Sequence, residues 1–463
     1  MNLYLSCGFF VLGGLLHFRF WATALSRHLL ALDSWRRASA GLLIAAICLM
    51  LYALSDPFWF EYTAGRVLLG VVLTLIAFAV IMFTYESHAR RGLVVIVAHY
   101  RWFGIPLALL CWGLGLWLLG WSYIGDVAEL DDCASDDQLN VVCGIRNAED
   151  LVTTPDEAFF IVPEFGGIGP FNAPQAHAAG RLMLVDLKAQ VAQPAAIRYA
   201  ENTWGDGSCQ RTGVMPLSPH GVDLIERGDG RYQLAVVNHA PSETVEMFEV
   251  VAEADVWRLI WRGCVQVPKV NYLNDISLAS DGSFYASHMY PPEFSIVELL
   301  MAALFRHATG YVVRWDTING FGQVPATDGG HPNGVVYDES QNILYVAYNL
   351  ADRIDAVDMT EAAVVASVTL NSPANLVLRD GSLWATSWDH DIADMAVCEY
   401  KVPCALPFSV HQLTPKMLRK ERRWRFNHAP LGLVTVAFAV NSRVWLGGIR
   451  TDRLGYFNIE PSG

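Results

Sequence analysis

The sequence predicts an all-β, six-bladed β-propeller preceded by an α-helical transmembrane domain of about four helices. Three observations predict this: four long apolar runs in the first 125 residues, one hairpin pattern repeated six times in the rest, and a change of charge between the two parts. The first part holds eight arginines, no lysine and four carboxylates, a net charge of +4. Since the whole chain carries −14, the remainder carries −18. We expect two domains, 1–125 and 126–463.

The composition excludes two classes of protein. Hydrophobic residues make up 53% of the chain and charged residues only 17%, which excludes an intrinsically disordered chain. The net charge of −14 argues against a nucleic-acid partner, because a protein that binds a phosphate backbone needs a basic surface.

The four apolar runs are each long enough to cross a bilayer, which takes about 20 residues. The first run is interrupted by His17 and Arg19. A signal peptide is its alternative interpretation, although no basic segment precedes it and no clear cleavage site follows it. We expect membrane spans near 3–24, 39–56, 65–84 and 103–123.

Charged residues in the loops predict the orientation of these spans. The loops after the first and third spans each carry three arginines, whereas six carboxylates follow the fourth span between 126 and 137. Arginine-rich loops stay in the cytoplasm. We therefore expect a multi-pass membrane protein, with the lipid bilayer as a partner and the propeller on the extracytoplasmic side. Anchoring is the expected role of the spans; haem ligation by their histidines is a weaker alternative.

The second domain repeats one hairpin six times. Each unit is a turn followed by an aromatic or apolar strand that ends in small residues. The average repeat of about 56 residues suits a four-stranded propeller blade. A β-sandwich is the rival interpretation, but a sandwich would not repeat one hairpin six times. The turns begin near Pro155, Gly228, Asp281, Gln341, Asp380 and Asn441.

A pair of residues with polar character precedes five of the six turns. In a propeller the first strand of each blade lines the central channel, so residues in equivalent phase converge on its axis. Oxygen-bearing side chains gathered there suit a hard cation, and Ca²⁺ tolerates mixed geometry better than Mg²⁺. Alternatively, Asn and Asp only begin these strands as Asx turns. The pairs are Glu149-Asp150, His220-Gly221, Asn274-Asp275, Asn333-Gly334 and Ala374-Asn375.

At these residues the sequence resembles the paraoxonase/arylesterase family of calcium-dependent lactonases, which are six-bladed propellers. The resemblance covers most of residues 144–460. Pro-His-Gly at 219–221 together with Val-Val-Asn-His at 236–239 is its most specific part. Further matches are Gly144-Ile-Arg-Asn-Ala-Glu-Asp-Leu, Leu273-Asn-Asp-Ile and Asn333-Gly-Val.

The resemblance implies two calcium sites. The ligands of a catalytic ion would be Glu149, Asn274, Asn333 and Asn375. The ligands of a buried structural ion would be Asp150, Asp275 and the backbone carbonyl of Val222.

The resemblance also implies a histidine dyad of His220 and His239. Calcium would hold the carbonyl oxygen of a lactone or aryl ester while His220 takes a proton from water. His239 would orient His220 or relay its proton. Either imidazole has the alternative of a purely structural hydrogen bond. His288 and His331 stand near the motifs and are expected at the substrate mouth.

The apolar segment from Met289 to Leu304 resembles the lid of the family's active site. We therefore expect a small amphipathic lactone or ester as substrate. The alternative for this segment is a core helix between strands.

Two departures from the family pattern matter. Ala374 replaces an Asp beside the last Asn ligand, which leaves Glu149 as the only charged ligand of the catalytic ion. Calcium affinity depends on ligand charge, so the alternative function is a non-catalytic, calcium-stabilised propeller that binds or senses a ligand at the membrane. Asp328 is a candidate to compensate. The family's closing cysteine pair is also missing, so closure of the ring is expected to rely on strand pairing, or on the membrane tether and other bridges.

Six cysteines lie beyond residue 125. An even number in an exported domain predicts disulfides. We expect the close pairs Cys133/Cys143 and Cys398/Cys404, which leaves Cys209 with Cys264. Six unpaired buried thiols are the alternative.

Overall fold

The chain divides into two compact units, Met1–Asp126 and Val127–Gly463. The computed structural model describes Gly113 and residues 132–167, 180–209, 211, 216–253, 256–390, 404–427 and 429–459. Apart from Gly113, the four predicted spans lie outside these residues. No helix within the described ranges is long and apolar enough to cross a membrane. The spans and their orientation therefore stay predictions.

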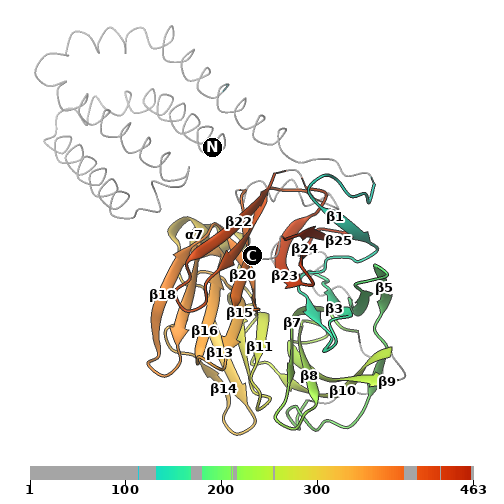
Figure 1. Ribbon diagram of the computed structural model, residues 1–463. Coiled ribbons are helices and arrows are strands. Elements are labelled where there is room, and N and C mark those ends of the chain that lie inside the picture. Colours follow the sequence, from blue (N-terminus) through green and yellow to red (C-terminus); the bar gives the residue numbers. More distant parts are fainter. Residues whose placement is uncertain are drawn as a thin grey trace, which may run out of the picture. The chain divides into compact units, whose positions relative to one another are not determined.

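The second unit is a six-bladed β-propeller, as predicted (Figure 1). The first blade comprises β2 (Val152–Thr153), β3 (Phe159–Glu164), β4 (Arg181–Asp186) and β5 (Val191–Pro194). The second comprises β7 (Pro219–Glu226), β8 (Tyr232–Asn238), β9 (Thr244–Glu253), β10 (Val256–Gln266) and, parallel to β10, β6 (Ile197–Tyr199). The third comprises β11 (Leu273–Leu278), β12 (Phe284–His288), β13 (Tyr311–Asp316) and β14 (Gly320–Gln323).

The remaining three blades follow the same order. The fourth comprises β15 (Pro332–Asp338), β16 (Ile343–Tyr348), β17 (Arg353–Asp358) and β18 (Ala363–Thr369), with the short 3-10 helix η1 (Asn349–Ala351) after β16. The fifth comprises β19 (Pro373–Arg379), β20 (Ser382–Trp388), β21 (Phe408–Leu413) and β22 (Lys420–Phe426). The sixth comprises β23 (Leu433–Val440), β24 (Arg443–Ile449), β25 (Arg453–Asn458) and β1 (Asn140–Cys143).

All six predicted hairpins join the first two strands of a blade. Each turn contains a residue in the left-handed region, which Gly, Asn and Asp adopt more readily than other residues. The positive φ angles are 55° at Glu157, 78° at Gly230, 87° at Gly282, 52° at Asn342, 48° at Asp380 and 52° at Asn441.

The first strand of each blade carries a β-bulge at the position predicted to line the channel. In β11, Leu273 pairs with His288 and Ile276 pairs with Ala286, so two residues lie opposite one. Such a bulge releases a residue from the ladder and re-aims its side chain. Equivalent shifts occur at 220–221, 333–334, 374–375 and 435. In the first blade an extra residue lies between the bridge at Ala148 and β2.

Strand pairing closes the ring, as expected without a closing cysteine pair. β1 comes from the start of the second unit and pairs antiparallel with β25 near the end of the chain, from Asn140 opposite Tyr456 to Cys143 opposite Arg453. Arg453 is only 1% exposed, and its guanidinium donates to the Asp132 carbonyl at 3.0 Å. The two ends of the propeller are thus held in one sheet.

Two of the three predicted disulfides are confirmed, Cys133–Cys143 and Cys209–Cys264. Cys404 is also disulfide-bonded, while its predicted partner Cys398 lies outside the described residues. The alternative of six unpaired thiols is therefore wrong.

The segment proposed as a lid or core helix contains α7 (Ile296–Phe305), which begins at a capping box formed by Ser295 and Glu298. Leu299 and Ala302 are buried against Tyr290, so this face of α7 belongs to the core.

Glycines next to the bulges allow neighbouring blades to approach closely. A Cβ on Gly334 would lie 2.5 Å from the carbonyl oxygen of Ala374 and 2.7 Å from the Cα of Asn375. A Cβ on Gly221 would lie 2.5 Å from the Cα of Asp275. The Gly in each His-Gly or Asn-Gly pair is therefore a packing requirement, because backbone atoms occupy the space.

We predict that Gly334→Ala lowers the free energy of unfolding by about 1–3 kcal/mol, because the obstructing atoms are backbone. Denaturant unfolding of the full-length protein measures the change. Gly228→Ala is the matched control, since nothing lies within 4 Å of its Cβ position. Equal stability of the two variants would contradict the requirement for close approach.

Candidate functional site

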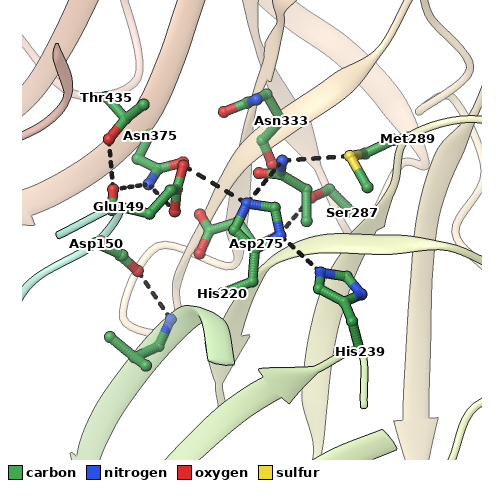
Figure 2. A network of polar contacts seen from close by, with 12 residues as sticks. Glu149, Asp150, His220, His239, Asp275, Ser287, Met289, Asn333, Asn375 and Thr435 are labelled. Atoms are coloured by element: carbon green, nitrogen blue, oxygen red, sulfur yellow. Dashed lines mark hydrogen bonds and ion pairs between the residues drawn. The ribbon is translucent and has the colours of Figure 1, made fainter. Parts of the chain in front are cut away.

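The bulges bring one polar residue from each blade to the centre of the propeller. Each of these six residues is at most 6% exposed. Hydrogen bonds join several of them: Asn375 donates to Glu149, and the Thr435 hydroxyl donates to the Glu149 carbonyl at 2.5 Å. Figure 2 shows this network. The central cluster, in blade order, is Glu149, His220, Asn274, Asn333, Asn375 and Thr435.

Three amide oxygens of the central cluster are buried without a hydrogen-bond partner among the described residues: Oδ1 of Asn274, Asn333 and Asn375. For Asn375 and Asn274 the amide nitrogen is already engaged. Nδ2 of Asn375 donates to the carboxylate and to the carbonyl of Glu149, both at 3.0 Å, and Nδ2 of Asn274 contacts the Met289 sulfur at 3.3 Å. An unpaired buried oxygen costs about 1–3 kcal/mol. The arrangement therefore leaves oxygen ends available for a cation.

The carboxylate of Glu149 is the charged member of this oxygen set. Burial raises its pKa to about 8, although the Asn375 hydrogen bond and nearby His239 partly offset the effect. A cation would remove this penalty by compensating the charge. Three amide oxygens and one carboxylate match the hard-donor preference of Ca²⁺. No group of three or more His, Cys, Asp or Glu side chains in the described ranges could hold a metal ion.

Asp150 and Asp275 form a second buried acidic pair. Asp150 accepts a hydrogen bond from the Val222 amide of the next blade at 2.8 Å, and Asp275 accepts one from the Val335 amide at 2.8 Å. Burial raises the pKa of both carboxyl groups well above the ordinary range. The nearby Glu149 raises that of Asp150 further, and Asp150 raises that of Asp275 further. These bonds link blade one to two and blade three to four, so the pair has a structural role even without an ion. The predicted role of the Val222 carbonyl stays a prediction.

The two predicted dyad histidines are in contact. Nδ1 of His220 lies 2.9 Å from Nε2 of His239. Nδ1 of His239 lies 2.5 Å from Oε1 of Glu243, a residue that the sequence analysis missed. His220 faces the Glu149 carboxylate on one side and His239 on the other (Figure 2). Phe165 stacks on the His220 ring at 4.2 Å between centroids.

Burial keeps the His220 imidazole neutral. It lowers the pKa of His220 well below the ordinary value, and the nearby His239 lowers it further. Nε2 of His220 lies 3.4 Å from the Asn274 amide nitrogen and 3.7 Å from the Glu149 carboxylate. The ring thus presents this nitrogen to the oxygen-lined part of the cluster.

The structure also places three further residues that the sequence analysis considered. His288 is buried, its Nδ1 accepts a hydrogen bond from the Tyr272 amide at 3.0 Å, and burial lowers its pKa to about 4. His331 is also buried, with its ring edge-on to Tyr290. Asp328 is exposed and accepts a hydrogen bond from Gln323, so it does not compensate for the missing carboxylate.

The sequence did not identify Thr435 and Glu243 as site residues, for different reasons. Thr435 stands between valines, so no polar pair marked it, although the phase of the sixth hairpin places a channel residue near it. Glu243 lies in the hairpin between β8 and β9. Its signal was an acidic residue four positions after His239.

The fold and site together define a six-bladed propeller with a buried, oxygen-rich centre beside paired imidazoles. The family model described as arylesterase matches residues 134–401, more than half of the chain. The chain therefore belongs to the arylesterase family. This membership supports a hydrolase of the esterase or lactonase type.

Similar folds occur among solved structures. A putative gluconolactonase is 15% identical, with a TM-score of 0.40 over 72% of this chain and 99% of that one. A luciferin-regenerating enzyme is 9% identical, with a TM-score of 0.43 over 70% and 96%. A putative glucose dehydrogenase from Thermus thermophilus is 12% identical, with a TM-score of 0.40 over 69% and 99%. At these TM-scores the similarities carry no weight for function. None of the curated proteins compared with the chain matches it significantly.

We predict that the protein in chelator becomes less stable as the pH rises from about 5 to about 8. The folded state holds the Glu149 proton up to a pKa of about 8, whereas the unfolded chain releases it near 4.5. The unfolded state is therefore favoured as pH increases. Thermal unfolding of wild type and Glu149→Gln tests this, with the exposed Glu361→Gln as control. The decrease in thermal stability with rising pH should become smaller in Glu149→Gln but not in the control. An unchanged pH dependence in Glu149→Gln would contradict the raised pKa of Glu149.

Proposed function

We propose that this chain is a calcium-dependent hydrolase of lactones, with side activity on aryl esters. The observation that carries the proposal is a set of four oxygen donors beside the neutral His220: the carboxylate of Glu149 and three Asn oxygens that have no hydrogen-bond partner among the described residues. Bound to these oxygens, Ca²⁺ would polarise the substrate carbonyl and stabilise the developing oxyanion. Membership in the arylesterase family supports the same class of reaction.

Residues of the chain would carry out proton transfer, orient the base and exclude water. Nε2 of His220 would accept a proton from the attacking water, as a neutral imidazole can. His239 would orient His220 through the 2.9 Å contact between their rings. Phe165 and Tyr272 would exclude water around the imidazoles, since Phe165 stacks on His220 and Tyr272 packs edge-on against His239 at 5.1 Å.

The substrate would be small and amphipathic. Buried apolar residues stand beside the central cluster, and the Met289 sulfur contacts Asn274 directly. Met289 belongs to an apolar group that includes Phe165, Tyr290 and Leu299 of α7. Such a wall would favour an alkyl or aryl group next to the scissile carbonyl.

A second ion would lie at Asp150 and Asp275. Both carboxyl groups are buried, and a neighbouring carboxyl group raises the pKa of each, Glu149 that of Asp150 and Asp150 that of Asp275. A cation at this pair would relieve the repulsion. The backbone carbonyl of Val222 would be a further ligand. This ion would join the blades rather than act on substrate.

The predicted membrane domain would hold the propeller at an extracytoplasmic surface, where amphipathic substrates concentrate. One observation favours a different function. Ala374 is buried next to Asn375 where the family has a carboxylate, so Glu149 is the only acid among the four predicted ligands of the catalytic ion. A site that binds calcium too weakly for catalysis would leave a propeller that only binds or senses a ligand.

Hydrolysis of a lactone and aryl-ester panel by the full-length protein tests the proposal. We expect turnover that requires calcium and is lost in His220→Gln, because the water would have no base. The exposed His307→Gln is the matched control and should keep wild-type rates. Absence of turnover at millimolar calcium, in a protein that calcium still stabilises against heat, would favour the binding function instead.

We further predict that Ala374→Asp tightens calcium binding by roughly tenfold or more, because it adds a second negative charge beside Asn375. Calorimetric titration measures the affinity. Ala374→Asn is the control, since the Asn side chain has nearly the same size as Asp and also carries an oxygen, but has no charge. If both variants bind calcium like wild type, ligand charge does not limit this site.

A further inference from the structure

The His239 side chain ends on a carboxylate that the family pattern did not identify. Oε1 of Glu243 lies 2.5 Å from Nδ1 of His239. The His239 side chain is fully buried, whereas that of Glu243 is 15% exposed. A chain of three groups therefore runs from the central cluster to the edge of the site.

This contact fixes where the protons of both imidazoles lie. An ionised carboxylate only accepts hydrogen bonds, so Nδ1 of His239 carries the proton. Nε2 of His239 is then an acceptor and takes its hydrogen bond from Nδ1 of His220 at 2.9 Å. The proton of His220 is thus on Nδ1, and its Nε2 keeps a lone pair. That lone pair is the one that faces Asn274 and Glu149.

We propose that Glu243 is a positioning residue that sets the tautomers of both histidines, so that His220 presents an unprotonated Nε2 to the central cluster. The structural assignment stands on the contacts. Its catalytic consequence rests on the proposed hydrolase function. Without the carboxylate, His239 could carry its proton on Nε2, and His220 would then place its own proton on the nitrogen facing the substrate.

The surroundings of Glu243 suit this role. Its backbone carbonyl accepts hydrogen bonds from the Val267 amide at 3.1 Å and the Gln266 side chain at 2.7 Å, so the hairpin is held in place. Oε2 of Glu243 is buried without a hydrogen-bond partner in the described part of the chain. Nearby Glu246 differs, because a buried ion pair with Arg211 and a hydrogen bond from Trp261 engage both of its oxygens. Glu243 is therefore available to His239.

His239 itself is held in the orientation that the contact requires. Its backbone amide donates to the Ser218 carbonyl at 3.0 Å, and Tyr272 packs edge-on against its ring at 5.1 Å. The ring is thus fixed by packing, while the carboxylate decides which nitrogen carries the proton.

Two variants of the full-length protein test the proposal, Glu243→Gln and Glu243→Leu. Glu253→Gln at the far end of β9 is the matched control, because its partners are the exposed Arg198 and the half-buried Arg258, away from the histidines. Ring-nitrogen NMR shifts of ¹⁵N-labelled histidines report the tautomers without any substrate. In wild type and in the control we expect His239 protonated at Nδ1 only. In Glu243→Leu we expect that preference to be lost.

Lactone kinetics give the second readout. We expect kcat to fall roughly 10- to 100-fold in Glu243→Leu, with KM within about twofold of wild type. Glu243→Gln should keep the wild-type tautomers and lose less activity, because its amide oxygen can still accept a hydrogen bond from Nδ1 of His239. A merely structural role would instead leave the tautomers unchanged. Wild-type tautomers in a folded Glu243→Leu protein, or a doubly protonated His239 in wild type, would overturn the proposal. If wild type hydrolyses nothing, the proposed function fails, and the NMR shifts still decide the role of Glu243.

Discussion

Each blade of this propeller inserts one extra residue into the strand nearest the channel, and the central site depends on that insertion. A regular ladder would commit the backbone at 274–275, 333–334 and 374–375 to the neighbouring strand. The bulge releases it and turns a polar side chain inward. Gly221 and Gly334 then allow the next blade to approach within van der Waals distance. The pairing of β1 with β25 keeps the first and sixth blades together, so Thr435 reaches Glu149.

The same geometry gives the centre an unfavourable contribution to the free energy of folding. It buries three amide oxygens without partners among the described residues and three carboxyl groups with raised pKa values. Bound cations would coordinate the unpartnered Asn oxygens and reduce the repulsion between the buried carboxyl groups. Ion binding would therefore be coupled to folding. The proposed chemistry uses the same features, because the three Asn oxygens without partners among the described residues would hold the ion, and the ion would bind a carbonyl oxygen. The groups that destabilise the centre would thus be the ones that the proposed function requires.

The sequence could predict the fold because each blade contains a local pattern, a turn followed by an apolar strand. The turns at Gly228, Asp281 and Asp380 are followed by apolar strands, and a polar pair begins six to eight residues before each of them. Thr435 lacked such a pair, and the contact of His239 with Glu243 is made across a hairpin that has no motif. The phase of the sixth hairpin and the acidic residue four positions after His239 were the signals available, and neither marks a contact without the structure. The resemblance to a known family located the remaining members of the central cluster, and the structure explains why they meet.

The most direct test is a crystal structure of the full-length protein grown with calcium, with anomalous data collected at long wavelength. We predict a calcium peak within about 2.3–2.6 Å of oxygens from Glu149, Asn274, Asn333 and Asn375. We also predict that the His220 ring lies beside that ion without binding it. A centre that holds only water, with the three Asn oxygens hydrogen-bonded to it, would contradict the central claim.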